Sequence, residues 1–221
     1  MKMLKALGIA ITLLLLMLQA VSAQAPQCTT KNADYDAVRD FSIQANPNGV
    51  WSYGWESTLG APLTLYTVPD TNCYPGFGIS VWHEEGPCDL PYVAHNDTDK
   101  QICYGSFCVP PTYLQLHPGR SGELTVLRWT APSSGKFLMQ TIFVGLDCCT
   151  TSTYVHVQLN SKRSFLKAPI TSYQWPLSFK PRPLALSAGD TLDFIVDQGI
   201  NGNYNNDSTG VEVKIWSEGQ H

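Results

Sequence analysis

Residues 122–147 constrain the fold more than any other stretch, because they read as two long β-strands joined by a tight turn. Apolar side chains occupy alternate positions in 124–129 and again in 137–144, which is the two-residue period of a pleated strand. Pro132 and Gly135 lie between the two segments, where proline presets one backbone dihedral and glycine tolerates a positive one. We therefore expect a hairpin, which needs further sheet to cover its apolar face.

The same alternation recurs along the chain in short segments separated by turns rich in Gly, Pro or Asn. The segments are 40–43, 50–55, 63–68, 77–82, 112–116, 154–159, 173–179, 192–197 and 211–216. No stretch has a convincing helical period. We expect an all-β chain, folded as an antiparallel two-sheet β-sandwich of jelly-roll type with about nine or ten strands. Pro181 and Pro183 restrict their segment to a sheet edge or to extended backbone.

The first 23 residues have the pattern of an export signal, with Lys2 and Lys5 before an apolar run and small residues at 21–23. The apolar run of about 13 residues is shorter than the roughly 20 needed to span a bilayer. We therefore expect a signal peptide at 1–23 and one secreted, extracellular β-sandwich domain at 24–221. Its 12 basic and 18 acidic residues give a formal charge of −6, which argues against nucleic acid and anionic membranes as partners.

All seven cysteines follow the predicted signal peptide, and in an exported protein they indicate disulfides. They are Cys28, Cys73, Cys88, Cys103, Cys108, Cys148 and Cys149. The number is odd, so one is left over or pairs with another chain, and the pairing is open. Cys103 and Cys108 are close enough to close a small loop, whereas the adjacent Cys148 and Cys149 are expected to reach elsewhere.

Residues 83–111 lose the alternation and are rich in Gly, Pro, Asp and Cys. We interpret them as a cysteine-rich loop insertion stapled by disulfides, because such a segment has little core of its own. His83, Cys88 and His95 also suggest zinc, but their spacing matches no known site pattern and no paired CxxC is present.

Three pieces of the chain resemble secreted β-sandwich domains of the carbohydrate-binding-module type. They are VLRWTAP with SGKF at 126–137, YVHV at 154–157, and LAL with AGDTLDF at 184–194. The likeness extends over about 40–216 apart from the insertion, and much of it is turn chemistry. It implies a jelly-roll fold and binding of carbohydrate or glycoconjugates. Ligand residues vary within that group, so the resemblance assigns none here.

Sugar sites combine aromatic rings, on which C–H faces stack, with directional polar groups. Trp51, Tyr53 and Trp55 share one face of their segment and form either a sugar platform or part of the core. A second candidate stands at the mouth of the insertion, where the alternative is loop packing. It comprises Trp82, His83 and Glu84, beside Glu85, and Tyr92, Tyr104 and Tyr113 could join it.

The segment 197–207 is dense in the oxygen donors that Ca²⁺ prefers, although Asn and Asp are also ordinary turn residues. The expected calcium ligands are Asp197, Asn203, Asn205 and Asp207. No cofactor is required, and structural calcium is the one ion proposed. Asn96 and Asn206 begin N-glycosylation sequons that matter in a eukaryotic host. A glycan on Asn206 would compete with calcium.

No catalytic motif is present: the chain has no GxSxG, no HExxH and no phosphate loop. A glycosidase carboxylate pair could lie among five loop acids, which are otherwise solvated: Glu84, Glu85, Asp89, Asp97 and Asp99. The leading hypothesis is an exported, non-catalytic protein that binds carbohydrate or glycoproteins. One alternative is a structural or adhesive subunit of an extracellular assembly, linked by disulfide to a partner chain. The other is a glycan-degrading enzyme.

Overall fold

The computed structural model describes residues 32–86, 88–149 and 151–218. Backbone contacts divide the chain at Ala33, and the strands all belong to the unit that begins there. The predicted signal peptide and Cys28 lie outside the described residues. None of the chain within the described ranges forms a helix of the length and hydrophobicity that spanning a bilayer requires.

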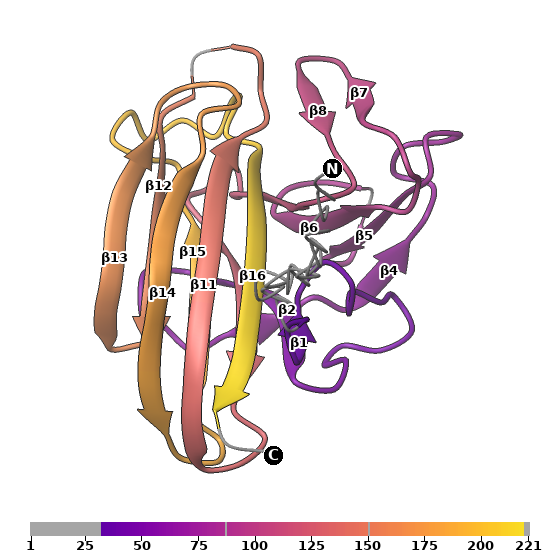
Figure 1. The fold of residues 1–221 in the computed structure, drawn as a ribbon. Helices are drawn as coiled ribbons and strands as arrows, with labels where there is room; N and C mark the ends of the chain where they lie inside the picture. Colours follow the sequence, from indigo (N-terminus) through magenta and orange to yellow (C-terminus); the bar gives the residue numbers. More distant parts are fainter. Residues whose placement is uncertain (1–31, 87, 150, 219–221) are drawn as a thin grey trace, which may run out of the picture. The chain divides into compact units, whose positions relative to one another are not determined.

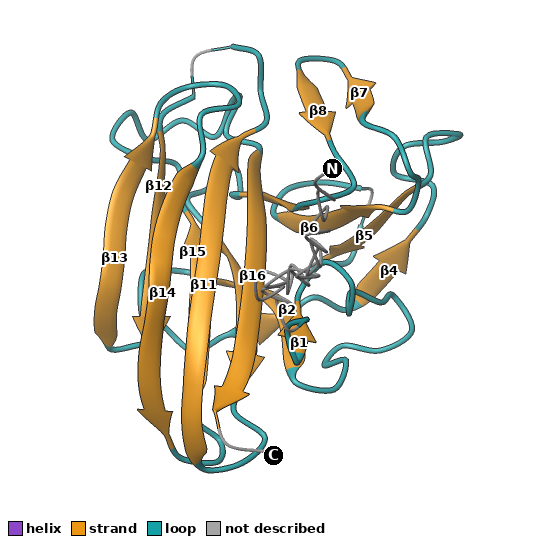
Figure 2. Ribbon diagram, in the orientation of Figure 1, coloured by secondary structure: helices purple, strands orange, loops and turns teal. Residues whose placement is uncertain are grey.

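Two antiparallel sheets form the fold, and strands joined by loops account for all regular structure in the described ranges (Figure 2). The eight-stranded sheet runs β14-β11-β16-β9-β6-β5-β4, with β1 also on β16. Its strands are β1 (Tyr35–Asp36), β4 (Val68–Asp70), β5 (Ile79–His83), β6 (Tyr92–Asn96), β9 (Leu114–His117), β11 (Gly135–Gly145), β14 (Leu177–Leu186) and β16 (Thr209–Glu218).

The six-stranded sheet runs β13-β12-β15-β10-β2-β3. Its strands are β2 (Trp51–Glu56), β3 (Thr64–Leu65), β10 (Leu124–Thr130), β12 (Thr153–Leu159), β13 (Arg163–Ile170) and β15 (Thr191–Val196). A separate hairpin pairs β7 (Ile102–Tyr104) with β8 (Phe107–Val109) (Figure 1). The all-β, two-sheet antiparallel sandwich is confirmed, with sixteen strands in the described part of the chain instead of nine or ten.

The core lies between the two sheets and is filled by the alternating apolar side chains of the sequence. Trp129 on β10 and Phe137 on β11 are both buried, and their ring centroids lie 5.2 Å apart in an edge-to-face arrangement. Tyr35 on β1 packs on Trp129 at 5.5 Å. Each such aromatic pair contributes about 0.5–1.5 kcal/mol beyond the burial of its surface. The rings of the two sheets therefore pack directly against each other.

The hairpin predicted at 122–147 is wrong, although both of its strands exist. β10 pairs with β2 and β15 in one sheet, whereas β11 pairs with β14 and β16 in the other. The connecting turn is held by another turn: the Ala131 N–H donates to the Asp190 carbonyl at 2.8 Å, and the Ala131 carbonyl accepts from the Gly189 N–H at 2.9 Å. Each strand has one strongly apolar face, and crossing between sheets lets two such faces cover each other.

The predicted loop insertion at 83–111 is also partly wrong, because it contains a central strand. β6 lies between β5 and β9 in the eight-stranded sheet, and its Val93 and Ala94 are fully buried. The alternation of β6 is only five residues long and is surrounded by Pro, Asp and Cys, which hides it in the sequence. The rest of the stretch contains the β7–β8 hairpin and loops.

Three smaller outcomes concern the edges of the sheets. β14, which carries Pro181 and Pro183, is an edge strand as predicted, since its neighbour is β11 alone. β13 was not predicted, and it forms the edge of the other sheet. The strand expected at 40–43 is absent, and the Asp40 carboxylate there instead accepts a hydrogen bond from the Asp36 N–H at 2.9 Å.

Candidate functional site

A pocket of about 330 Å³ opens beside the β7–β8 hairpin, where several loops meet. Those loops are the segments before β6, after β9 and before β16. Aromatic rings line the pocket together with charged, hydroxyl and amide side chains. The rings are Tyr74, Tyr92, Phe107 and Tyr204, and the polar side chains are Asp89, Ser106, His117, Arg120, Asp147, Asn205, Asn206 and Ser208.

Tyr74 is the centre of the aromatic wall. Its ring packs edge-on against Tyr104 at 5.2 Å, Phe107 at 5.6 Å and Tyr92 at 6.4 Å between centroids. The Tyr74 hydroxyl donates to the Tyr92 hydroxyl at 2.9 Å, and Gln115 Nε2 donates to the same oxygen at 2.9 Å. Burial raises the pKa of Tyr92 well above its usual value, so this hydroxyl stays protonated. The wall is therefore fixed by both packing and hydrogen bonds.

Two disulfides hold the segments that carry these rings. Cys73 precedes Tyr74 and is bonded to Cys88, while Cys103–Cys108 crosslinks β7 to β8. The segments have few buried apolar side chains of their own, so crosslinks replace part of the missing core. A disulfide typically contributes about 2–4 kcal/mol on the chain-entropy model.

The opposite side of the pocket is polar. Arg120 Nε donates to Asp89 Oδ1 at 2.8 Å, and Nη1 donates to the Tyr204 hydroxyl at 2.7 Å. Desolvation raises the pKa of Asp89, but hydrogen bonds from the Leu90 N–H and the Arg120 guanidinium outweigh it, and the net shift is downward. Both side chains are about half exposed, so water screens the pair and it contributes little to folding. Two of the five guanidinium N–H groups are engaged, which leaves donors for a ligand.

The floor of the pocket contains two buried ionisable side chains. His117 lies opposite Tyr92 in the β6–β9 register, and its Nδ1 donates to the Pro118 carbonyl at 2.9 Å. Burial lowers the pKa of His117, so the ring is neutral at pH 7 and Nε2 is an acceptor. Asp147 accepts from Ser106 Oγ at 2.7 Å and from the Ser208 N–H at 2.8 Å.

The aromatic stripe on β2 belongs mainly to the core, which is one of the two alternatives that the sequence leaves open. Trp51 is 1% exposed and Tyr53 is fully buried, so neither ring offers a face to a sugar. Trp55 is half-buried, packs against the core and donates from Nε1 to the Glu84 carboxylate. β2 lies between β10 and β3, where one face of the sheet must cover the sandwich interior.

The second sequence candidate is divided by the structure. Trp82 and His83 are buried on β5, so they do not form an exposed platform. Tyr92 lines the 330 Å³ pocket, and Tyr104, which is 46% exposed, lines a neighbouring pocket of about 210 Å³ together with Tyr74. Tyr113 lies instead in a third pocket, of about 330 Å³, between Val144, Leu146 and Pro110.

Sequence reasoning missed Tyr74, Phe107, Arg120 and Tyr204. They come from four separate segments, three loops and the start of β8, and no local spacing connects them. Tyr204 lies inside the Asn-rich loop 197–207, whose oxygen donors indicate calcium and not an aromatic site.

The proposed calcium oxygens are largely engaged within the fold. Asp197 Oδ2 accepts from His156 Nε2 at 2.8 Å, and Oδ1 accepts from the Gly199 N–H at 2.6 Å. Asp207 is buried, with Oδ1 3.2 Å from Thr151 Oγ1. Asn203 Oδ1 accepts from the Asn205 N–H at 2.9 Å, while the Asn205 side chain lines the pocket. Calcium binding by this loop stays a prediction.

The glycosylation site at Asn96 is wrong on steric grounds. The side chain is 1% exposed, and Nδ2, the atom that would carry a glycan, donates to the carbonyls of Lys100 and Val109 at 2.7 Å each. Asn206 is half-buried at the pocket and has a left-handed backbone, with φ of 63°. Its glycosylation stays a prediction.

The remaining cysteines and loop acids are placed as follows. Cys148 and Cys149 are exposed and free, with Sγ atoms 4.0 Å apart. The prediction that each forms a disulfide elsewhere is therefore not met within the described residues. Among the predicted loop acids, only Asp89 lines the pocket. Asp97 is hydrogen-bonded to His95 at 2.6 Å and does not line the pocket.

No family model and no curated protein matches the chain. Among solved structures, it is similar to a family 35 carbohydrate binding module from an environmental isolate, with 13% identity, 76% of this chain and 93% of that chain covered, and a TM-score of 0.32. It is also similar to TmCBM61 in complex with beta-1,4-galactotriose, with 9% identity, 76% of this chain and 88% of that chain covered, and a TM-score of 0.35. A third similar structure is the secreted serine protease VesC from Vibrio cholerae, with 13% identity, 57% of this chain and 24% of that chain covered, and a TM-score of 0.34.

The chain spans about a quarter of the protease's length and most of either module. The carbohydrate-binding modules are all-β sandwiches, as this chain is. At these identities and TM-scores the likeness carries no argument about function. The fold assignment rests on the strands and their pairing.

Proposed function

We propose that this chain is an exported, non-catalytic β-sandwich protein that binds carbohydrate or a glycoconjugate in the pocket beside the β7–β8 hairpin. The observation that supports it is the convergence of four rings with Arg, Asp, Asn and neutral His side chains around about 330 Å³. Sugars need this combination, because their C–H faces pack on rings and their hydroxyls need directional partners. The volume lies at the lower end of the roughly 300–1,000 Å³ typical of ligand pockets.

Each polar group has a definite part in this proposal. Arg120 donates to sugar oxygens with its unused N–H groups, while Asp89 and Asn205 accept from hydroxyls. The neutral His117 ring accepts at Nε2, if a hydroxyl reaches the floor. The neighbouring 210 Å³ pocket shares Tyr74, Cys88, Asp89 and Tyr92 with the first, so a second sugar unit has a place to extend.

The acids of the pocket favour binding over hydrolysis. A glycosidase needs a carboxyl group whose pKa is raised so that it can donate a proton near neutral pH. The pKa of Asp89 is lowered, and its partner Arg120 keeps it ionised. Asp147 is buried and accepts two hydrogen bonds from the chain. We therefore expect no release of reducing sugar from a bound polysaccharide.

Export is part of the proposal. The signal-peptide pattern motivates it, and the two disulfides among the described residues are typical of an oxidising compartment. A carbohydrate on a cell wall, a matrix or a glycoprotein is the partner that such a protein would meet.

Trp175 provides a competing surface and hence a control. It is 75% exposed beside a pocket of about 230 Å³ that contains Pro169 and Pro176. That lining has hydroxyls but no charged or amide side chain. Directional contacts to a sugar are therefore fewer there than around Arg120.

The test is a glycan array followed by polysaccharide pull-down with wild-type, Arg120→Ala and Trp175→Ala proteins. We expect retention of wild type and of Trp175→Ala, and loss of retention in Arg120→Ala. Failure of the folded wild type to bind any glycan would remove the proposal. Binding that depends on Trp175 and not on Arg120 would contradict the assignment of the pocket.

A second candidate function is a subunit of a covalent extracellular assembly. The specific observation in its favour is that Cys148 and Cys149 are both exposed and unpaired. Non-reducing electrophoresis distinguishes it from a monomeric sugar-binding protein.

A further inference from the structure

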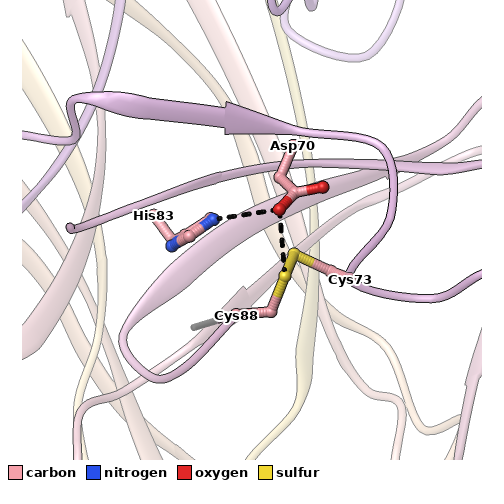
Figure 3. A group of neighbouring side chains, drawn as sticks. All are labelled: Asp70, Cys73, His83 and Cys88. Atoms are coloured by element: carbon pink, nitrogen blue, oxygen red, sulfur yellow. Dashed lines mark hydrogen bonds and ion pairs between the residues drawn. A yellow bond between two sulfur atoms is a disulfide. The ribbon is translucent and has the colours of Figure 1, made fainter. Parts of the chain in front are cut away.

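Four side chains with metal-ligand chemistry converge at one end of the β4–β5 pair (Figure 3). They are Asp70, Cys73, His83 and Cys88, and one ligand atom of each lies within 4.8 Å of all the others. Asp70 is opposite Val81 in the β4–β5 register, which makes it the diagonal neighbour of His83 on the same face of the sheet. The Cys73–Cys88 disulfide closes the group from the loop side.

His83 has a nitrogen that the fold leaves unsatisfied. The residue is 1% exposed, and Nε2 has no hydrogen-bond partner. Nε2 points toward Asp70 Oδ2, but the distance is 3.7 Å, which is too long for a hydrogen bond (Figure 3). Buried polar atoms are almost always paired in folded proteins, so an unpaired nitrogen aimed at a carboxylate requires an explanation.

We propose that these four side chains bind Zn²⁺ when the two cysteines are reduced. Two thiolates, an imidazole nitrogen and a carboxylate oxygen are ligands that zinc takes, in tetrahedral geometry. Bond lengths of about 2.0–2.3 Å place two ligands of one zinc ion about 3.3–3.8 Å apart. Asp70 Oδ2 is 3.3 Å from Cys88 Sγ, which is within that range, and 3.7 Å from His83 Nε2, a few tenths of an ångström longer than an oxygen and a nitrogen on one zinc ion require.

The disulfide and the metal exclude each other. A small thiol reductant supplies two electrons, the Cys73–Cys88 S–S bond breaks, and each sulfur gains a proton while the reductant becomes its own disulfide. Zn²⁺ then displaces both thiol protons, and two Zn–S bonds form. Only thiolates ligate zinc, so the oxidised protein has no such site.

The consequence is a replaceable crosslink. In the oxidised chain the disulfide ties the segment that carries Tyr74 to the loop that carries Asp89. In the reduced chain Zn²⁺ ties the same two cysteines, and adds Asp70 and His83. Cys88 also lines the proposed sugar pocket, yet the metal proposal does not depend on sugar binding.

The test uses the full chain carrying Cys148→Ser and Cys149→Ser, reduced with a phosphine, desalted without oxygen and titrated with Co²⁺. We expect thiolate-to-cobalt charge-transfer absorption and tetrahedral d–d bands that saturate at one ion per chain and disappear when Zn²⁺ is added. The unreduced protein should show neither. Bound Zn²⁺ should also raise the melting temperature of the reduced protein, because it binds the folded state.

Two ligand variants and one matched control identify the site. Asp70→Asn and His83→Gln should weaken Co²⁺ binding by roughly 100-fold, since even outer partners of a ligand cost roughly 10–100-fold. His95→Gln should leave it unchanged, because His95 pairs with Asp97 outside this group. If His83→Gln does not fold, the partly exposed Asp70 still decides the question. Absence of Co²⁺ binding, or binding that survives Asp70→Asn undiminished, overturns the proposal.

Discussion

Arg120 and Tyr204 are 84 residues apart in the chain and form one unit at the mouth of the pocket. The guanidinium donates to the tyrosine hydroxyl at 2.7 Å, and its carbon lies 5.0 Å from the centre of the same ring. The contact joins the turn after β9 to the loop before β16. A cation held over an aromatic ring is attracted by the negative face of that ring. This pair therefore fixes the geometry of the pocket wall while the guanidinium stays partly in water.

Separating the ring from the hydroxyl of Tyr204 tests how the pocket binds its ligand. We expect Tyr204→Ala to weaken affinity for the retained glycan about tenfold or more, since a well-packed aromatic contact often costs more than 1 kcal/mol when truncated. Tyr204→Phe keeps the ring and loses only the bond to Arg120, so its effect should be smaller. Isothermal titration measures both. Equal loss in the two variants would show that the hydroxyl, not the ring, makes the contact.

The burial of the β2 stripe leads to a stability prediction. Trp51→Ala should lower the free energy of unfolding by about 3–5 kcal/mol, because it empties a packed core position. Trp175→Ala removes a ring that is 75% exposed, and should change that energy by no more than about 0.5 kcal/mol. Urea denaturation followed by circular dichroism measures both. A mild effect of Trp51→Ala would indicate that the core assignment of this face is mistaken.

The class of fold could be predicted because alternation is local. The longer predicted strands, such as β10 and β15, show their period of two within a few residues, and Pro181 and Pro183 mark an edge by their missing N–H groups. Pairing could not be predicted in the same way. The segments at 124–129 and 137–144 are equally compatible with a hairpin and with a crossing between sheets. Which one forms depends on the partners β2, β15, β14 and β16, far away in the sequence.

The candidate site was harder to predict than the fold. Aromatic residues in regular strands attract attention, but their position in a sheet is what buries them, as Trp51 shows. The pocket rings lie in loops, as Tyr74 and Tyr204 do, or at the start of a short strand, as Tyr92 and Phe107 do, so no long alternation marks them. Arg120 and Tyr204 approach each other only because β9 and β16 are neighbours in the larger sheet. Tyr92 and Tyr104 could be predicted because both belong to the cysteine-rich stretch 83–111.

Asp207 gives a pH dependence with a definite sign. Burial raises its pKa from 3.8 to about 6, so between these values the folded protein binds more protons than the unfolded one. Stability from this group is present at low pH and is lost as pH rises through about 4 to 6. The free-energy difference between Asp207→Asn and wild type should thus shift in favour of the variant by on the order of 3 kcal/mol between pH 4 and pH 7.

Asp197 is the matched control for this pH effect, because its pKa shifts the other way. Desolvation raises it, but hydrogen bonds from His156 and the Gly199 N–H outweigh desolvation and leave the pKa lowered. Its stabilising contribution is present above pH 4 and is lost on acidification. The free energy of unfolding of Asp197→Asn should therefore fall relative to that of wild type as pH rises. Urea titrations at several pH values measure the free energy of unfolding of each variant relative to wild type. If this difference changes with pH in the same direction for Asp207→Asn and Asp197→Asn, the opposite pKa shifts of the two carboxyl groups are refuted.

The sequence predicts that disulfides staple the whole of 83–111, whereas the structure predicts that they protect only part of that stretch, together with residues before it. Reduction should speed amide exchange in the β7–β8 hairpin and in 71–78, which rely on Cys103–Cys108 and Cys73–Cys88. β6 should stay protected, because β5 and β9 bond it on both sides. Hydrogen exchange read by mass spectrometry, with and without reductant, distinguishes these segments. Loss of protection in β6 together with the hairpin would mean that the larger sheet itself depends on the crosslinks.

The exposed thiols of Cys148 and Cys149 lead to the last prediction. Their Sγ atoms are 4.0 Å apart, and the hydrogen bond with Cys148 raises the pKa of Cys149, so Cys149 forms the reactive thiolate less readily than an isolated thiol. A bond between adjacent residues is strained, whereas a bond to another molecule has no such constraint. On exposure to air at high protein concentration, we therefore expect covalent dimers on non-reducing gels, which disappear with reductant.

The variants decide which cysteines form these dimers. Cys148→Ser with Cys149→Ser should abolish the dimers, because both exposed thiols are removed. Cys103→Ser with Cys108→Ser should leave them, since that pair is bonded within β7–β8. Cys28→Ser is the further control, because Cys28 lies outside the described residues. The contrary outcome is a protein that stays monomeric in air and has two titratable thiols, both of which the Cys148→Ser and Cys149→Ser variant lacks. That outcome would argue against covalent assembly and in favour of a monomeric sugar-binding protein.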